Sequence, residues 1–99
     1  MLESKVEAYL VKRVKALGGE VRKVQWIGRR GAPDRLVMLP LTPLSAGKPH
    51  EGRTVFVEVK RPGGKVEAHQ LREHERMRKM GQAVLVLDSI EAVDGWLWC

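Results

Sequence analysis

The chain has 99 residues, of which 43% are hydrophobic and 30% charged, and its formal net charge is +6 at pH 7. This length suits one domain and leaves no room for a second core. No apolar run approaches the roughly 20 residues that cross a bilayer, and no signal-peptide pattern opens the chain. Cys99 is the only cysteine, which excludes intrachain disulfides and cysteine-ligated zinc. We therefore expect a cytoplasmic protein.

The positive charge favours a polyanionic partner. Lys and Arg outnumber Asp and Glu by 18 to 12 and recur along the whole chain. In many basic proteins the positive charges are simply solvated. Charge alone therefore favours nucleic-acid binding and a solvated basic surface about equally. The basic helical segments lack the broad aromatic and leucine-rich face of a membrane-surface helix. We therefore expect no membrane partner.

The first half of the chain predicts one helix followed by two strands. Apolar side chains at helical spacing predict an amphipathic helix over residues 3 to 17, and Gly18-Gly19 marks its end. Residues 20 to 26 form an irregular predicted strand. A turn containing glycine and proline then leads into a short apolar strand over residues 35 to 39.

The second half begins with a loop over residues 40 to 53, which is rich in proline and glycine and has little periodicity. Residues 54 to 60 form the clearest strand, with valines on one face and Phe56, Glu58 and Lys60 on the other.

A helix is predicted over residues 67 to 80, and the apolar run over residues 83 to 87 suits a strand covered on both faces. A short helix through Val93 follows, after which Trp96 and Trp98 alternate like the exposed face of an edge strand. This order of elements predicts an α/β domain with a central mixed sheet flanked by helices.

Three charged residues combine into a candidate catalytic site. Glu58 and Lys60 lie on one face at the end of the clearest strand, and Asp34 begins the strand after Gly31-Ala-Pro33. Two carboxylates brought close together would favour Mg²⁺ or Mn²⁺. Each feature also has a plain structural interpretation, a strand-edge salt bridge and a turn-forming aspartate. The spacing is weak by itself, because Glu3-Ser4-Lys5 repeats it on a helix.

The combination resembles the PD-(D/E)xK nuclease superfamily, and most of all the small virus-type members of its VRR-NUC family. The likeness rests on Gly31-Ala-Pro-Asp34, then Val57-Glu58-Val59-Lys60, then Gln70 on the following helix. It extends over nearly the whole chain. Its weight comes from the order of these residues and the elements that carry them.

The resemblance implies a restriction-endonuclease-like core that binds Mg²⁺ or Mn²⁺ and hydrolyses DNA. Asp34, Glu58 and the Val59 carbonyl would bind the metal ion. Lys60 would orient or activate the attacking water and offset charge on the phosphate.

The same resemblance implies a metal ligand from the first helix and a glutamine from the second. Of the two first-helix acids, we expect Glu7 to be the ligand and Glu3 to be accessory, since Glu3 also suits the helix dipole. Gln70 would contact the site or the substrate backbone; a solvent-facing glutamine is the alternative.

Basic residues before the site are candidates for binding nucleic acid. Arg29 and Arg30 lie between two glycines and suit phosphate contact, with an exposed basic turn as the equal alternative. Lys23, on the preceding predicted strand, could also approach the site. The resemblance extends to junction-resolving enzymes, which act as homodimers, so we expect branched DNA as substrate. A non-catalytic nucleic-acid-binding protein with the same fold is the main alternative, and an enzyme acting on RNA or nucleotides is a third.

Overall fold

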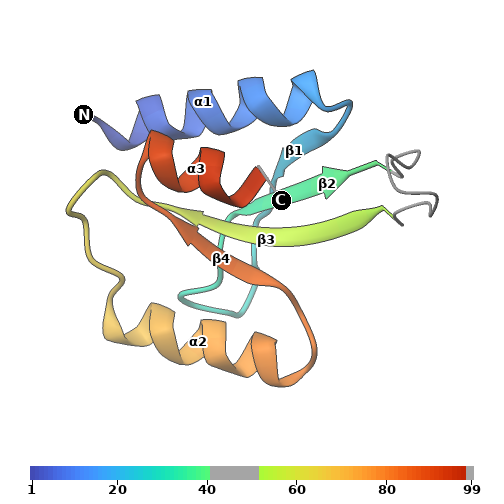
Figure 1. Ribbon diagram of the computed structural model, residues 1–99. Coiled ribbons are helices and arrows are strands. Elements are labelled where there is room, and N and C mark those ends of the chain that lie inside the picture. The colour runs from blue at the N-terminus through green and yellow to red at the C-terminus, as the bar shows by residue number, and fades with distance from the viewer. Residues whose placement is uncertain (41–51, 98–99) are drawn as a thin grey trace.

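The computed structural model describes residues 1–40 and 52–97, which form a mixed sheet flanked by helices (Figure 1). Most of the loop expected over residues 40 to 53 lies outside the described residues. The order of elements confirms the predicted α/β fold. It is α1 (Glu3–Ala16), β1 (Glu20–Lys23), β2 (Arg35–Leu39), β3 (Arg53–Val59), α2 (Ala68–Lys79), β4 (Val84–Leu87) and α3 (Ile90–Leu97).

The four strands lie in the order β1-β2-β3-β4. β1 and β2 are antiparallel, as are β2 and β3, whereas β3 and β4 are parallel. Parallel neighbours need a crossover connection, and α2 supplies it. Figure 1 shows α1 and α3 on one side of the sheet and α2 on the other. The two faces of β3 therefore meet different helices.

The main core lies between the sheet and the helices α1 and α3. Val55, Val57 and Val59 alternate along β3 and are at most 3% exposed. They pack with fully buried side chains of the two helices, namely Val6, Leu10, Val14 and Val93. Burying one such side chain stabilises the fold by roughly 1.5–3 kcal/mol. A slip of one residue would turn Glu58 into this core, so the valines determine that Glu58 faces α2.

The described helix α1 ends as the sequence predicts, because Gly18 follows it with a φ of +83°. A side chain there would be strained in this left-handed conformation. At the start of α2, a capping box joins Glu67 and Gln70, each side chain accepting a backbone N–H of the other residue. Gln70 is thereby held in the first turn of α2. No helix among residues 1–40 and 52–97 is long and apolar enough to cross a membrane.

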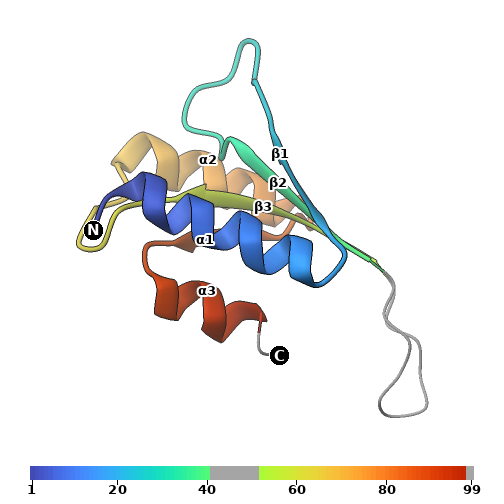
Figure 2. The same ribbon diagram turned by 90° about the horizontal axis from the view of Figure 1, so that it is seen from above.

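The end of β1 differs from its prediction. The strand ends at Lys23, whereas the sequence suggested residues 20 to 26. The Val24 N–H still donates to the Asp34 carbonyl at 2.9 Å, and the chain then leaves the sheet as a loop. Figure 2 shows this β1–β2 loop extending beyond the rest of the sheet.

The edge-strand interpretation of Trp96 is wrong. Helix α3 continues through Gly95 and Trp96 to Leu97, and Trp96 packs against the core cluster. The Ser89 hydroxyl accepts the Ala92 N–H at 2.9 Å and caps the helix. The Trp-x-Trp pattern was too short to separate a period of two from the helical spacing of Val93 and Leu97. Trp98 lies outside the described residues.

Candidate active site

Asp34 and Glu58 meet at the end of the sheet where β2 begins and β3 ends. Arg35 is paired with Val57 in the β2–β3 register, so the next position along the ladder places Asp34 opposite Glu58. Opposite residues of an antiparallel pair share a face. The Asp34 backbone is fixed there, because its carbonyl accepts the Val24 N–H. The two carboxylates lie on the face toward α2.

Glu58 is 9% exposed and is difficult to ionise. Burial raises the pKa of Glu58 to about 7; the Lys60 ammonium acts against this shift, and the charges of Asp34 and Glu3 add to it. A buried carboxylate with other carboxylates nearby favours either a proton or a cation. This site is therefore suited to a positive ion near neutral pH.

Lys60 is held by the first turn of α2. Its Nζ donates to Gln70 Oε1 at 3.0 Å, and the same oxygen accepts the Glu67 N–H at 2.9 Å. The capping box of α2 thus also orients the lysine that follows β3. Glu58 and Lys60 lie on one face of the strand, and Gln70 faces them from the helix.

His74, on α2, lies next to Glu58 and is fully buried. Its Nε2 lies 3.6 Å from Glu58 Oε1, and neither ring nitrogen has a hydrogen-bond partner among the described residues. Burial lowers the pKa of His74, and Arg78 and Lys60 lower it further. A neutral imidazole next to Glu58 follows from this environment.

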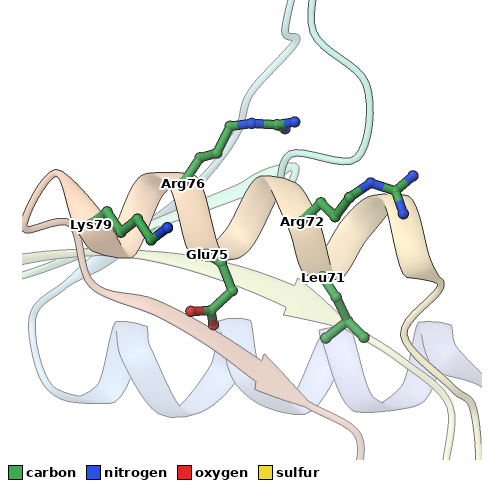
Figure 3. Close-up of a pocket in the computed structure, with 5 residues that line it drawn as sticks. All are labelled: Leu71, Arg72, Glu75, Arg76 and Lys79. Atoms are coloured by element: carbon green, nitrogen blue, oxygen red, sulfur yellow. The ribbon is translucent and has the colours of Figure 1, made fainter.

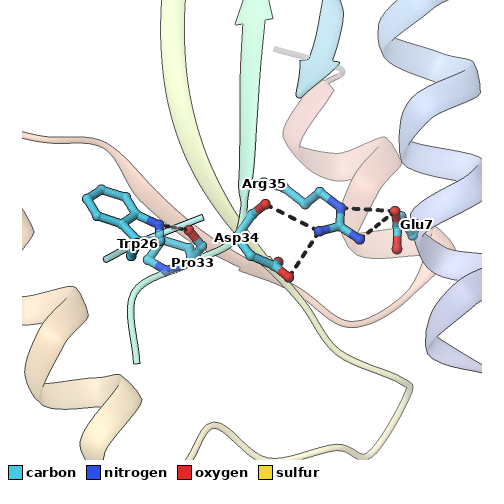
Figure 4. Close-up of polar contacts among 5 residues, drawn as sticks. All are labelled: Glu7, Trp26, Pro33, Asp34 and Arg35. Carbon is cyan, nitrogen blue, oxygen red and sulfur yellow. Dashed lines mark hydrogen bonds and ion pairs between the residues drawn. The ribbon is translucent and has the colours of Figure 1, made fainter. Parts of the chain in front are cut away.

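Arg35 links Asp34 to the first helix (Figure 4). Its guanidinium is 2.7 Å from Glu7 Oε1 and 3.0 Å from Asp34 Oδ2. The arginine side chain is only 12% exposed, which makes this bridge firmer than a surface ion pair. Arg35 therefore holds in place two of the carboxylates expected to bind metal.

The two acids of α1 differ in their relation to Glu58. Glu7 is engaged by Arg35, whereas Glu3 is the α1 residue whose charge raises the pKa of Glu58. Glu3 lies one helical turn nearer the start of α1, toward the end of the sheet.

Val59 is buried in β3 and pairs with Leu87 of β4.

The β1–β2 loop is attached to α2 at two places. Arg29 forms a two-pronged ion pair with Glu73, with distances of 2.6 and 3.1 Å. Gly31 has a φ of +87° and lies so close to α2 that an added Cβ would be 2.8 Å from the His69 carbonyl oxygen. This loop carries the predicted phosphate-binding residues. Arg29 is paired, while Arg30 and Lys23 are exposed and have no ion pair among the described residues.

The donor set matches the metal that the resemblance implies. Mg²⁺ prefers oxygen ligands and is commonly held by one or two carboxylates, with water and substrate phosphate completing the shell. Asp34 and Glu58 supply two such carboxylates, and the charge of Asp34 adds to the rise that burial causes in the pKa of Glu58, so a cation between them would relieve the repulsion. No group of three His, Cys, Asp or Glu side chains within residues 1–40 and 52–97 is arranged to hold an ion. With two carboxylates from the protein, the remaining ligands of such an ion would come from water or a substrate phosphate.

A shallow hollow lies on the outer face of α2, away from these carboxylates (Figure 3). Its lining comes from one helix and is mostly basic, comprising Leu71, Arg72, Glu75, Arg76 and Lys79. None of the predicted site residues lines it. It is a surface feature of the helix and separate from the candidate active site.

Three residues of the site were not predicted from the sequence to belong to it. Glu73 and His74 lie three and four positions after Gln70, a spacing that places all three on one helix face, and that spacing was the available signal. Arg35 was included only as a strand residue. Arg35 lies two residues before the buried Val37, and this spacing would have placed both residues on the face of the sheet toward α1.

Comparisons with known proteins agree with this geometry. No protein-family model matches the chain. A protein of Acyrthosiphon pisum secondary endosymbiont phage 1, named "Putative nuclease p44", is 45% identical over 87 residues, covering 88% of this chain and 83% of the phage protein. A solved structure titled "VRR_NUC domain" is 45% identical, with a TM-score of 0.79 over 97% of this chain and 94% of that one. At this identity and coverage, the chain belongs to the VRR-NUC family.

Proposed function

We propose that the protein is a nuclease, and specifically an endonuclease that hydrolyses DNA phosphodiester bonds with Mg²⁺ or Mn²⁺. The observation that carries the proposal is the juxtaposition of Asp34 and Glu58, with Lys60 on the same face. The raised pKa of Glu58 supports a cation at this place. The similarity to a phage protein named as a nuclease supports the reaction class.

The residues divide the chemistry between binding and orientation. Asp34, Glu58 and the Val59 carbonyl would hold the metal, which supplies positive charge to the phosphate and a more acidic bound water. Lys60 is held by Gln70 at 3.0 Å. It would orient the attacking water and stabilise the charge that develops on the phosphate oxygens.

The DNA contacts would come from the β1–β2 loop and from the end of β1. Arg30 and Lys23 are exposed beside the site, and guanidinium groups bind phosphate through paired hydrogen bonds. A chain of 99 residues offers little surface for a long duplex. We therefore propose a homodimer that acts on branched or junction DNA.

The second candidate function is a non-catalytic DNA-binding protein. It is favoured by Arg35, whose guanidinium already neutralises Glu7 and Asp34, and by the lack of a three-ligand metal group in the described part of the chain. Cleavage assays separate the two functions.

The deciding experiment is cleavage of branched, flapped, linear and single-stranded DNA in Mg²⁺, Mn²⁺ or EDTA. We expect cleavage with metal only, and a loss of at least about 100-fold in Lys60→Ala, because the charge it offsets is concentrated on the phosphate. Lys15→Ala is the matched control, since Lys15 is exposed near the other end of α1. DNA binding without any cleavage would support the second candidate.

The ligand from α1 needs its own comparison. The resemblance implies Glu7, whereas in the structure Glu3 acts on Glu58 and Glu7 pairs with Arg35. Glu7→Gln and Glu3→Gln are each titrated with Mn²⁺ by calorimetry. The variant with the larger loss of affinity identifies the ligand, and equal losses would mean that both acids act only through their charge.

A further inference from the structure

Ile27 is an almost fully exposed apolar side chain in the β1–β2 loop. It is 93% exposed, more than any other large hydrophobic residue among those the structure describes. It forms a turn with Gly28, called the tip below, within the β1–β2 loop; this loop extends beyond the sheet in Figure 2. A single exposed apolar side chain is common on protein surfaces, so the meaning of Ile27 depends on the loop that holds it and on its charged neighbours.

The loop holds Ile27 in this position from both sides. Just before it, the Trp26 Nε1 donates to the Pro33 carbonyl at 2.7 Å, and the indole lies 5.6 Å from the Phe56 ring. Two residues after it, Arg29 is paired with the buried carboxylate of Glu73. Only the turn residues Ile27 and Gly28 lie between these two anchors. The isoleucine is therefore presented on a supported tip.

The surroundings of Ile27 match a polyanion. From residue 21 to residue 33 the chain has four basic residues and no acidic one: Arg22, Lys23, Arg29 and Arg30. Arg22 pairs with Glu20 and Arg29 with Glu73, whereas Lys23 and Arg30 have no ion pair among the described residues. A second copy would bring the same positive segment and be repelled. Duplex DNA instead offers phosphates to Lys23 and Arg30 and stacked bases to the isoleucine.

The tip is also close to the candidate active site along the chain. Gly31 contacts the first turn of α2 at His69 and Gln70, and Gln70 binds Lys60. Asp34 ends the same loop. A DNA strand with its phosphate at Asp34 and Glu58 would thus pass the tip within a few nucleotides.

We propose that Ile27 is a wedge that inserts between neighbouring bases of duplex DNA next to the scissile phosphate. Apolar side chains at such positions unstack a base step and kink the duplex. The cost of insertion is lower where stacking is already interrupted, as at a branch or a mismatch. The wedge would therefore select branched DNA, and this proposal rests on the nuclease function proposed above.

The test places 2-aminopurine at the branch point of a DNA junction, where its fluorescence increases on unstacking. Binding is measured in EDTA, and cleavage is measured separately in Mg²⁺. We expect wild type to raise the fluorescence and Ile27→Ala to bind the junction about tenfold more weakly without that rise. Ile27→Met should retain both effects, because it keeps an apolar side chain of similar length.

Leu17→Ala is the control, since Leu17 is also exposed and lies before β1, at the opposite end of that strand from the loop. It should behave as wild type. If wild type binds and cuts DNA but Ile27→Ala gives the same fluorescence and affinity, the wedge is wrong and the nuclease function stands. If wild type neither binds nor cuts DNA, both proposals fall. A weaker self-association of Ile27→Ala with unchanged DNA binding would assign the residue to a protein interface and overturn the wedge.

Discussion

Burial raises the pKa of Glu58 to about 7, and this shift couples the stability of the metal-free protein to pH. The unfolded carboxyl titrates near 4.5, so between pH 4.5 and 7 the folded state binds more protons than the unfolded state. The contribution of Glu58 to folding therefore falls as pH rises through this window. At 1.36 kcal/mol per unit, the total is about 3 kcal/mol.

Glu58→Gln should remove this dependence. The measurement is urea unfolding in EDTA from pH 4.5 to 8, taken as the difference between wild type and variant. The difference is needed because His74, whose pKa burial lowers, changes stability in the opposite sense below its unfolded pKa. We expect the variant to gain stability relative to wild type as pH rises, while losing cleavage. A constant difference would contradict the raised pKa.

Arg35 gives a second prediction at the level of one residue. Its guanidinium offsets the charges of Glu7 and Asp34, so Arg35→Gln should destabilise the metal-free protein by about 1–2 kcal/mol, a value reduced for the partial exposure of both carboxylates. A divalent cation would replace the lost charge. Mg²⁺ should therefore raise the melting temperature of the variant more than that of wild type.

Arg13→Gln is the matched control for this measurement. Arg13 pairs with Asp94 between α1 and α3, and neither residue belongs to the site. It should lower stability without increasing the response to Mg²⁺. An equal response to Mg²⁺ in wild type and Arg35→Gln would separate Arg35 from the metal site.

Among single residues, the sequence predicted those that carry a motif and missed those that support it. Asp34, Glu58 and Lys60 stand out because their spacing has a chemical meaning. Arg35 and His74 belong to no such motif, and their roles depend on which helix covers which face of the sheet. Tertiary packing decides which helix covers each face, because the valines of β3 pack against α1 and α3 and the crossover through α2 covers the other side.

At the level of elements, helix α2 contacts the sheet and the β1–β2 loop with one face and exposes basic side chains on the other. Gln70, Glu73 and His74 face the sheet and the β1–β2 loop through the contacts described above. The outer face carries Arg72 and Lys79, seven residues apart. We expect this outer face to contact DNA phosphates in addition to those bound at the site.

The double variant Arg72→Ala/Lys79→Ala tests this expectation. Each phosphate contact contributes about 0.9 to the slope of log affinity against log salt concentration. The slope should therefore fall by up to about 2, with little change in preference among DNA sequences. Lys12→Ala/Lys15→Ala, on α1, removes the same charge and should change the slope less. Equal changes in both variants would indicate only general attraction.

The attachment of the β1–β2 loop to α2 is a further property of the elements. Glu73 is buried, and its ion pair with Arg29 holds the loop. Glu73→Gln should weaken that pair, because the neutral amide no longer attracts the guanidinium. We expect faster amide hydrogen exchange at residues 27 to 31, measured by mass spectrometry, with α1 unchanged as the internal reference. Unchanged exchange in the loop would show that Gly31 and Trp26 suffice to hold it.

Element boundaries were predicted best where one local signal decides them. Gly18 ends α1, and the capping box begins α2 within a residue of the prediction. β1 ends early because its ladder stops at the pair of Lys23 with Arg35, and just beyond it the Val24 N–H donates to the Asp34 carbonyl. The end of this pairing depends on where β2 begins, so no local signal at residues 24 to 26 reports it. The extent of α3 depends on packing of Trp96 and Leu97 against the core.

For the whole molecule, the alternation of β3 carries most of the predictive information. Its valines specify the face toward α1 and α3, which leaves Glu58 and Lys60 facing α2. Asp34 joins them through the antiparallel register with β2. No comparable pattern in the sequence predicts how the chains assemble. The oligomeric state is therefore inferred from the proposed function.

A nuclease that resolves a junction must cut two strands, and one chain presents one candidate site. We therefore expect a symmetric dimer, with a sedimentation mass near twice the 11.2 kDa of one chain. Mixed dimers of wild type and Lys60→Ala test how the sites share the work. If each site cuts its own strand, mixed dimers bound to a supercoiled cruciform plasmid will leave nicked circles, whereas wild-type dimers will give linear DNA. Mixed dimers that still linearise the plasmid in one binding event would mean that a single site cuts both strands, and a monomer with full activity would remove the dimer from the mechanism.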